Sequence, residues 1–216
     1  MTFEKMRKIV GYNAAFKRER VFALDKKSVA SFFDNIAAKW EQSLHCDDDK
    51  IDKILDCADI GEGKSVLDIA CGTGVLFPYY IKRDAAKIIG VDISRKMVEK
   101  ALEKAKDERI TVLMGDAESL KLNNFDRCVI FNAFPHFEKP RNIILAAKTA
   151  LAKGGRFTVA HDESRAKINS RHLAIASEVS IMLPCAEELA CMMEKWFTVD
   201  VKVDSKELYI VSGVLK

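Results

Sequence analysis

The sequence predicts an α/β protein built around a mostly parallel sheet. From residue 64 onward, short apolar runs alternate with helical segments, which is typical of a parallel sheet covered on both faces. The last two apolar runs, Phe197–Val203 and Glu207–Val214, have the spacing of an antiparallel hairpin. The predicted parallel strands are Ser65–Ile69, Lys87–Val91, Ile110–Met114, Arg127–Asn132 and Arg156–Ala160, with helices near residues 74–83, 94–107 and 139–152.

The first 60 residues are predicted to be mainly helical. In Val29–Trp40, apolar residues recur at i, i+3, i+4 and i+7 and therefore share one helix face. The segment Asp48–Cys57 repeats this spacing. The apolar positions are Val29, Phe32, Phe33, Ile36, Ala37 and Trp40 in the first segment, and Ile51, Ile54 and Leu55 in the second.

Two features organise the second half of the chain. Gly154 and Gly155 are predicted to end the 139–152 helix, where a left-handed cap is favoured. Residues 162–195, rich in Ser, Glu and Met, are predicted to form a helical insertion over the edge of the sheet. We therefore expect one domain with a helical arm and cap (1–60), a βα core (61–161), this insertion (162–195) and a hairpin (196–216).

Composition and charge leave room for one substantial core. The 216 residues are 49% hydrophobic and 31% charged, which suffices for one core with a small cap but not for two full domains. The formal net charge is +3, and residues 1–27 hold eight Lys or Arg against three Asp or Glu. A basic arm is thus predicted before a nearly neutral body. Because Glu4, Glu19 and Asp25 interrupt its basic residues, a solvated helix face is the default interpretation.

The compartment is predicted to be the cytoplasm. The first 20 residues lack the uninterrupted apolar segment and cleavage site of a secretory signal, and no run of 18 apolar residues could span a membrane. The six cysteines are scattered and form no C-x-x-C pair, so we expect reduced thiols that mostly fill the core.

The most informative stretch is VLDIACGTGVL, residues 66–76. A strand enters a tight turn through Gly72 and Gly74 and continues as a helix, so backbone can approach a ligand closely and free N–H groups face an anion. The stretch lacks the G-x-G-x-x-G spacing of dinucleotide sites, which disfavours a nicotinamide oxidoreductase.

Polar side chains stand at the ends of four successive strands. Asp68 ends the first, and Asp92, predicted to be exposed, ends the second, where a carboxylate can accept both hydroxyls of a ribose. Asp116 follows the third strand and can accept from an adenine amino group, and Asn132 ends the fourth. Ligands bind at the carboxyl ends of strands in open parallel sheets, so these side chains predict one nucleoside site.

In this order and spacing, VLDIACGTG, GVDIS, GDAESL, FDRCVIFNAFPHF and LAKGG resemble class I S-adenosylmethionine-dependent methyltransferases. The resemblance covers about residues 32–160 and is strongest to the small-molecule type that includes the ubiquinone and menaquinone C-methyltransferases. It implies a Rossmann-like, seven-stranded sheet, with residues 61–161 as the cofactor-binding core. It also implies S-adenosyl-L-methionine as cofactor and S-adenosyl-L-homocysteine as product.

The resemblance assigns roles to the motif residues. Gly72 and Gly74 would line the methionine end of the cofactor, Asp92 the ribose, and Asp116 with Ala117 the adenine. Residues 32–40 resemble the N-terminal element of the family, whose aromatic residue approaches the cofactor. Ala70 stands where many members carry glycine. The predicted cofactor-binding residues are Trp40, Asp68, Ala70, Gly72, Gly74, Asp92, Ile93, Met97, Asp116, Ala117 and Asn132.

Methyl transfer from a sulfonium depends on alignment and exclusion of water, and needs a base only when the acceptor arrives protonated. His136 and His161 follow strands at the ligand edge and are the predicted catalytic residues, with His172 approaching from the insertion. The alternative is a purely structural role, in which His136 only packs with its aromatic neighbours. Metal binding by the histidines with Asp162 or Glu163 is a weaker alternative, because their spacing is not that of ligands, and no metal is predicted.

The predicted acceptor is a small molecule. A nucleic-acid or protein acceptor guided by the basic arm is an alternative, although residues 132–135 read NAFP rather than the N/D-P-P-Y/F of amino-methylating nucleic-acid enzymes. A non-catalytic module that binds the cofactor is a third. The oligomeric state stays open.

We also expect residues 162–195 and the N-terminal helices to form a lid over one pocket, surrounded by Trp40, Phe134, His136, His161 and Met182–Met193.

Overall fold

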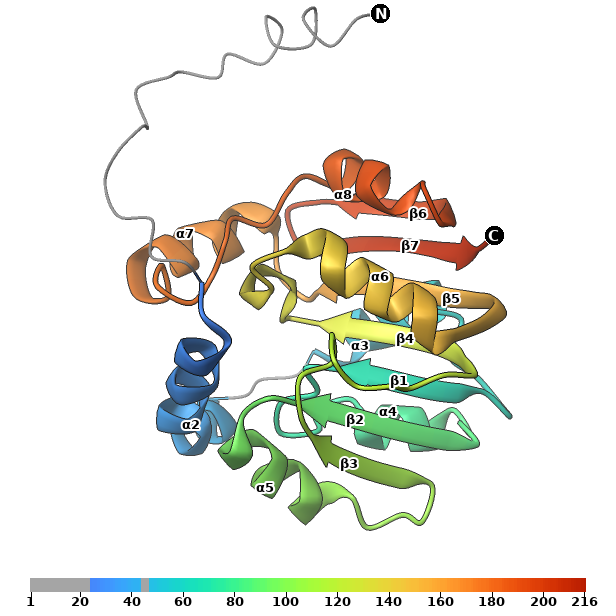
Figure 1. The fold of residues 1–216 in the computed structure, drawn as a ribbon, viewed down its shortest axis with the longest axis horizontal. Coiled ribbons are helices and arrows are strands. Elements are labelled where there is room, and N and C mark those ends of the chain that lie inside the picture. Colours follow the sequence, from blue (N-terminus) through green and yellow to red (C-terminus); the bar gives the residue numbers. More distant parts are fainter. Residues whose placement is uncertain (1–23, 44–46) are drawn as a thin grey trace, which may run out of the picture.

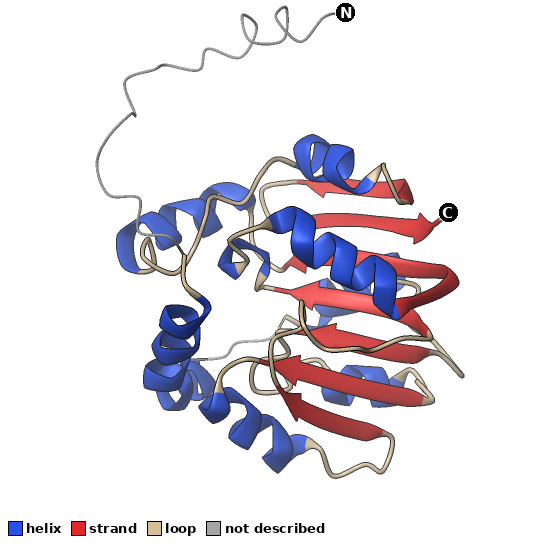
Figure 2. Ribbon diagram, in the orientation of Figure 1, coloured by secondary structure: helices blue, strands red, loops and turns tan. Residues whose placement is uncertain are grey.

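The computed structural model describes residues 24–43 and 47–216. Most of the predicted basic arm and Cys46 lie outside the described residues. Within them, seven strands form one sheet in the order β3-β2-β1-β4-β5-β7-β6, with helices on both faces (Figures 1 and 2). The strands are β1 (Ser65–Ile69), β2 (Lys87–Asp92), β3 (Ile110–Met114), β4 (Phe125–Phe131), β5 (Leu151–His161), β6 (Phe197–Asp204) and β7 (Tyr209–Leu215).

Strand direction follows the predicted pattern. The pairs β1–β2, β1–β4, β2–β3 and β4–β5 are parallel, whereas β7 runs antiparallel to both β5 and β6. Helical crossovers separate the parallel strands, and a short turn at residues 205–208 allows the antiparallel pairing of β6 with β7. The predicted mostly parallel, seven-stranded sheet with its C-terminal hairpin is confirmed.

The helices are α2 (Lys26–Ser43), α3 (Asp48–Cys57), α4 (Phe77–Lys82), α5 (Arg95–Lys104), α6 (Pro140–Ala150), α7 (Arg165–Ile175) and α8 (Ala186–Met193), with a 3₁₀ turn η2 at Phe134–His136. Three of them begin at a side-chain cap: Asp47 accepts from Lys50 N, Ser94 from Met97 N, and Ser164 from Lys167 N. None of the helices in residues 24–43 and 47–216 is long and apolar enough to cross a membrane.

The two faces of the sheet bury separate apolar cores. Alternate residues of β1 point to opposite sides, so Val66 packs with α3 and α4 while Leu67 packs with α6 and α8. Strands β1 and β4 lie at the centre of the sheet and are buried on both faces, which explains their continuous apolar sequence. This burial fixes the strand ends on which the polar residues stand.

The predicted glycine cap of the 139–152 helix is wrong. Helix α6 ends at Ala150, and Leu151 already has an extended conformation as the first residue of β5. Gly154 does have a left-handed backbone, with φ +74°, but it lies in a bend within β5. A Cβ on Gly155 would lie 2.9 Å from Ala152 O and 3.0 Å from Phe125 O. Gly155 is therefore required by the close approach of β5 to the start of β4, whereas Gly154 is favoured by its left-handed backbone.

The insertion divides into two parts with different neighbours. Helix α8 packs on β6 and β7, and its Leu189 and Met193 belong to the main core. The end of α7 and the residues after it contact α2 through Val29, Ala176 and Val179. Figure 1 shows α2 and α7 together at the edge where β1, β2 and β4 end. Only the α7 half of the insertion therefore covers that edge.

Candidate active site

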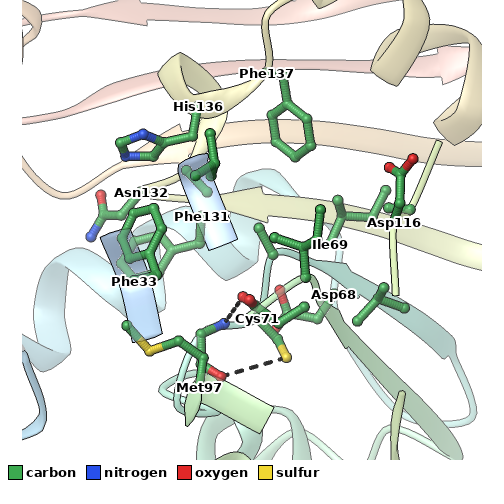
Figure 3. A pocket seen from close by; sticks show the side chains of 18 of the residues that line it. Phe33, Asp68, Ile69, Cys71, Met97, Asp116, Phe131, Asn132, His136 and Phe137 are labelled. Carbon is green, nitrogen blue, oxygen red and sulfur yellow. Dashed lines mark hydrogen bonds between the residues drawn. The ribbon is translucent and has the colours of Figure 1, made fainter. Parts of the chain in front are cut away.

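A cavity lies at the carboxyl ends of β1 to β4, beneath α2 (Figure 3). Phe33, Asn132 and His136 lie together on one side of it, and Asp116 lies on the opposite side. The structure thus brings the four predicted strand-end residues to one place. The predicted cofactor-binding residues that line the cavity are Trp40, Asp68, Ala70, Gly72, Asp92, Ile93, Met97, Asp116, Ala117 and Asn132.

The loop after β1 requires a left-handed backbone at three positions. Ala70, Gly72 and Gly74 have φ values of +56°, +55° and +74°. A Cβ on Gly72 would meet no atom within 4 Å, whereas a Cβ on Gly74 would lie 2.6 Å from the ring of Phe77. The absence of a side chain at Gly72 therefore leaves open space in the cavity lining. The absence of a side chain at Gly74 leaves room for the ring of Phe77 in α4. Gly74 is not among the residues that line the cavity, and its contact with the cofactor stays a prediction.

Asp92 holds this loop in place. Its Oδ2 accepts from Gly72 N at 2.9 Å and its Oδ1 from Ser94 N at 2.8 Å. Only 8% of the residue is exposed, so the prediction of an exposed carboxylate is wrong. Burial raises the pKa of Asp92 to about 6, although backbone hydrogen bonds from Ser94, Gly72 and Ile93 oppose the shift. Because each oxygen keeps a lone pair, the carboxylate can still accept from a second donor.

Asp116 is bound by a lysine that the sequence pattern did not single out. Lys26 Nζ lies 2.7 Å from Asp116 Oδ2 and 3.1 Å from Glu118 Oε2, and it lines the cavity from the first turn of α2. Burial would raise the pKa of Asp116, but hydrogen bonds from Lys26 and Ser119 lower it below its usual value. Lys26 belongs to the basic arm, where no spacing distinguishes it from the other cations.

Asp68 has an unusual environment for a carboxyl group. It is 1% exposed, and neither of its oxygens has a hydrogen-bond partner of normal geometry within the described chain. Burial, with a contribution from the charge of Asp92, raises the pKa of Asp68 to about 8. A cationic ligand group is the natural partner of such a carboxyl. The S-adenosylmethionine implied by the sequence carries one in its α-ammonium, so the residues present fit this cofactor.

Asn132 connects the ends of two strands. Its Nδ2 donates to Asp162 Oδ1 at 2.9 Å, and its Oδ1 accepts from Asp162 N at 3.3 Å. The residue has a left-handed backbone with φ +54°, a conformation that asparagine tolerates better than most residues. Its amide is therefore hydrogen-bonded to the residue that follows β5, and Asn132 contributes to the cavity as part of its wall.

His136 faces the cavity in a defined orientation. Its Nδ1 lies 2.8 Å from the carbonyl oxygen of Val179, so Nδ1 carries the proton and Nε2 keeps its lone pair. The ring makes an edge-to-face contact with Phe33 at 4.8 Å between centroids and lies 5.0 Å from the ring of His172. Burial lowers the pKa of His136 to about 4. The imidazole is thus neutral at pH 7 and available as a hydrogen-bond acceptor.

His161 lies outside the lining of this cavity. Strand β5 extends through His161, whose ring packs against Tyr209 of β7 at 5.9 Å. The residue is 2% exposed, its Nε2 has no partner within the described residues, and burial lowers its pKa to about 3. His172 is likewise nearly buried behind His136. No cluster in the described part of the chain has the donors to hold a metal ion.

The predicted composition of the single pocket needs correction. Trp40 and His136 line the cavity, but Phe134 and Met193 are fully buried in the core. Met182 is 51% exposed. Because α8 packs on the sheet instead of the cavity, its apolar residues serve the core. The lining also includes two residues that sequence reasoning missed, Phe137 and Glu138, which follow the 3₁₀ turn η2 after the fourth strand.

A second polar contact, in addition to that of Lys26 with Asp116, holds helix α2 over the cavity. Asp34 Oδ1 accepts from Ser94 Oγ at 2.6 Å and from Lys96 N at 2.9 Å, at the start of α5. Burial is the largest single influence and would raise the pKa of Asp34, but these bonds, together with the charges of Lys96 and Arg95, lower it below its usual value. Since Ser94 N also donates to Asp92, one hydrogen-bonded chain runs from the cofactor loop to α2.

Comparison with known proteins supports the predicted family. Residues 66–155 match a family described as methyltransferase domain. The chain is 30% identical over 141 residues to 2-methyl-6-phytyl-1,4-hydroquinone methyltransferase 2 of Oryza sativa, covering 62% of this chain and 40% of that protein. It is 38% identical over 73 residues to an RNA methyltransferase of Bdellovibrio bacteriovorus, covering 33% and 19%. The chain thus spans less than half the length of these curated relatives.

Solved structures share the whole architecture. Magnesium protoporphyrin IX methyltransferase of Synechocystis, solved with S-adenosylhomocysteine, superposes with a TM-score of 0.69 at 17% identity, covering 89% of this chain and 100% of the other. The [4+2]-cyclase SpnF gives a TM-score of 0.72 at 16% identity, covering 89% and 97%. The resemblance to class I S-adenosylmethionine-dependent methyltransferases is confirmed. Since the fold also serves a cyclase, the chemistry must be argued from the site.

Proposed function

We propose that this chain, which carries a class I S-adenosylmethionine-dependent methyltransferase domain, transfers a methyl group from S-adenosylmethionine to a small-molecule acceptor. The observation that carries the proposal is one continuous cavity. Its lining joins the loop after β1 and the carboxylates Asp92 and Asp116 to an aromatic wall of Phe33 and Phe137 with His136. Donor and acceptor would therefore meet in a space covered by α2.

The cofactor end of the cavity would use side chains at successive strand ends. Asp116 would accept from the adenine amino group, Asp92 from the ribose hydroxyls, and Asp68 would face the α-ammonium group. The turn at Gly72 would let the backbone approach the methionine part. When bound, S-adenosylmethionine supplies an activated methyl group on its sulfonium, so the chain needs to provide alignment and a dry site.

The acceptor end would orient a nucleophile. The Nε2 lone pair of His136 can accept a hydrogen bond from a hydroxyl or amine, and the contact with Phe33 fixes the ring. Because the imidazole is neutral at pH 7, it would hold the acceptor proton without repelling the sulfonium charge. Closure by α2 would exclude water. His136 is therefore the proposed catalytic residue, and His161, outside the cavity lining, is not carried into this proposal.

The test combines binding with product detection. Calorimetric titration with S-adenosylhomocysteine should show one site, and Asp92→Ala should abolish or strongly weaken it. The protein is then incubated with methyl-labelled S-adenosylmethionine and, separately, with a small-metabolite extract, total RNA and a protein extract. Label in a small molecule that depends on Asp92 supports the proposal. Label only in RNA or protein would transfer the function to a macromolecular acceptor, and absence of S-adenosylhomocysteine binding would refute it.

A further inference from the structure

We propose that Lys26 controls cofactor exchange, by holding the first turn of α2 on Asp116 in the free protein and on Glu118 when a cofactor is bound. The inference rests on the proposed function, because it takes the adenine of an S-adenosyl compound as the group that displaces Lys26 from Asp116. It gives a role to Lys26 and Glu118, two residues of the cavity lining that the proposed function does not use.

Helix α2 forms one wall of the cavity along most of its length. The helix spans Lys26–Ser43, and its lining residues run from Lys26 in the first turn through Val29 and Phe33 to Trp40. The opposite wall is made by the carboxyl ends of β1 to β4. A ligand bound between these walls is therefore in contact with α2, and movement of the helix changes how easily the ligand enters and leaves.

The two polar contacts that hold α2 differ in their position relative to the cavity. The contact of Asp34 with Ser94 joins α2 to the start of α5, and neither residue is among those that line the cavity. In the other contact, Lys26 and its partners Asp116 and Glu118 all belong to the lining. A ligand in the cavity can therefore compete for the Lys26 contact and leave that of Asp34 in place.

One oxygen of Asp116 has no capacity left for a ligand while Lys26 is bound. Its Oδ2 accepts from Lys26 Nζ at 2.7 Å and from Ser119 Oγ at 2.8 Å, and its Oδ1 accepts from Glu118 N at 3.0 Å. A carboxylate oxygen offers two lone pairs, so both lone pairs of Oδ2 are used. Ser119 lies in the same turn as Asp116, with its N–H bonded to the Asp116 carbonyl. An amino group that approaches Oδ2 thus displaces the lysine.

Glu118 offers the displaced ammonium a second partner. Its Oε2 lies 3.1 Å from Lys26 Nζ, and its side chain is 13% exposed, against 24% for Asp116. Asn142 Nδ2 donates to the same oxygen at 3.4 Å. Burial would lower the pKa of Lys26, but hydrogen bonds and charges of both carboxylates raise it, so the ammonium is charged at neutral pH. Lys26 therefore keeps an ionic partner after an amino group takes its place on Asp116.

This exchange of partners predicts separate effects on the two rate constants of binding. The contact with Asp116 slows entry of the ligand, and the contact with Glu118 slows its departure. Removal of the Lys26 charge should therefore raise both rate constants and leave the affinity nearly unchanged. Removal of the Glu118 charge should raise mainly the dissociation rate constant, because Lys26 still binds Asp116 in the free protein. The effects should be a few-fold, since partly exposed ion pairs are weak.

The experiment is stopped-flow fluorescence of the full chain with S-adenosylhomocysteine. Trp40 lines the cavity and serves as the reporter, whereas Trp196, the second tryptophan, packs on the main core. In Lys26→Met, both rate constants should rise about three- to fivefold, with the dissociation constant within about twofold.

Two further variants separate the steps. Lys27→Met removes the same charge from the exposed neighbouring residue and is the matched control, in which both rate constants should stay unchanged. In Glu118→Gln, dissociation should become about threefold faster while association stays within about 1.5-fold.

A salt series on the unmodified protein provides a second measurement that needs no variant to fold. Dissociation should become faster as ionic strength rises from about 0.05 M to about 0.5 M, because salt screens the ion pair, and this dependence should be weaker in Lys26→Met.

Unchanged rate constants in Lys26→Met, equal changes in Lys27→Met, or dissociation that is independent of salt would overturn the inference while leaving cofactor binding intact. Unchanged dissociation in Glu118→Gln would overturn the transfer of Lys26 to that residue. Absence of any S-adenosylhomocysteine binding would instead refute the proposed function.

Discussion

The two ends of the cavity bury titratable groups of opposite kinds. At the cofactor end, Asp68 and Asp92 have raised pKa values, and at the acceptor end His136 has a lowered one. Desolvation is the largest cause in all three, because it disfavours the charged form of acids and bases alike. The difference teaches that burial leaves both Asp68 and His136 mainly neutral at pH 7, one as a carboxyl that a cation can ionise and the other as an imidazole that can accept a hydrogen bond.

The largest expected effect is that of Asp92→Ala at the cofactor end. The change removes the acceptor of Gly72 N and Ser94 N and leaves two buried donors unpaired. We expect binding of S-adenosylhomocysteine to weaken by about 3 kcal/mol or more and the free energy of unfolding to fall by about 1–3 kcal/mol. Calorimetry and urea unfolding measure the two. An unchanged affinity for S-adenosylhomocysteine would show that Asp92 does not bind the cofactor. It would also contradict the comparison of the two ends of the cavity.

A change at the acceptor end should leave the cofactor end intact. In His136→Gln, turnover of the identified acceptor should fall about 100-fold while the affinity for S-adenosylhomocysteine stays within about twofold of the unmodified protein. The physical reason is that, in the proposed arrangement, the Nε2 lone pair would accept from the acceptor and would not contact the adenosine. The measurement pairs a methyl-transfer assay with calorimetry, and Lys39→Met on the exposed face of α2 is the control. Full turnover in His136→Gln would show that this histidine only packs with its neighbours and has no catalytic role.

Acid should act on the two ends in opposite directions. The folded pKa of His136, about 4, lies below the ordinary histidine value of 6.5, so its contribution to stability is present above pH 6.5 and is lost as pH falls toward 4. The raised folded pKa of Asp68 has the opposite sign, since its neutral form is favoured as pH falls below about 8. Between pH 7 and 4.5, His136→Gln should therefore lose about 2 kcal/mol less unfolding free energy than the unmodified protein.

The measurement is urea unfolding at closely spaced pH values for the unmodified protein, His136→Gln and Asp68→Asn. Asp68→Asn should show the steeper acid loss of the three, because it lacks the compensating carboxyl. Parallel stability curves for all three proteins would contradict the assignment of opposite titrating groups to the two ends.

The contact that joins the two ends predicts a smaller effect. Asp34→Ala removes the acceptor of Ser94 Oγ and Lys96 N and should reduce the free energy of unfolding by about 1 kcal/mol. Hydrogen exchange should increase across residues 26–43, and turnover should fall more than cofactor affinity, because α2 then covers the acceptor end less firmly. Asp52→Ala, which removes an ion pair between α3 and Arg83 at the end of α4, is the control. Exchange that is unchanged in residues 26–43 would show that Asp34 does not hold α2.

The smallest effect is expected at Ala70. Its left-handed φ of +56° costs an alanine about 1 kcal/mol, which glycine does not incur. Glycine also gains entropy in the unfolded chain, so Ala70→Gly should change the free energy of unfolding by less than about 1 kcal/mol, in the stabilising direction. Thermal unfolding measures it. A loss of stability would show that contacts of the Ala70 methyl with the core outweigh the backbone strain.

The sequence by itself determined the sheet and the cofactor end, because both are encoded by local patterns. The apolar runs of β1 and β4 predict buried parallel strands, and VLDIACGTG with Asp92 and Asp116 places ligand-binding residues at their ends. Parallel strands bring such ends together whatever the intervening sequence contains, so residues distant in the chain could be assigned to one site.

Only the tertiary structure decided the acceptor end and the state of the carboxyls. Whether a histidine after a strand lines the cavity depends on where that strand stops and on what packs beside it, which separates His136 from His161. The ion pair of Lys26 with Asp116 joins segments that no local pattern relates. Burial of the Asp68 carboxyl, whose oxygens have no hydrogen-bond partner of normal geometry among residues 24–43 and 47–216, likewise arises from neighbouring strands and α4. These properties come from packing between distant segments, and packing sets desolvation, orientation and the hydrogen-bond partners that a linear pattern does not contain.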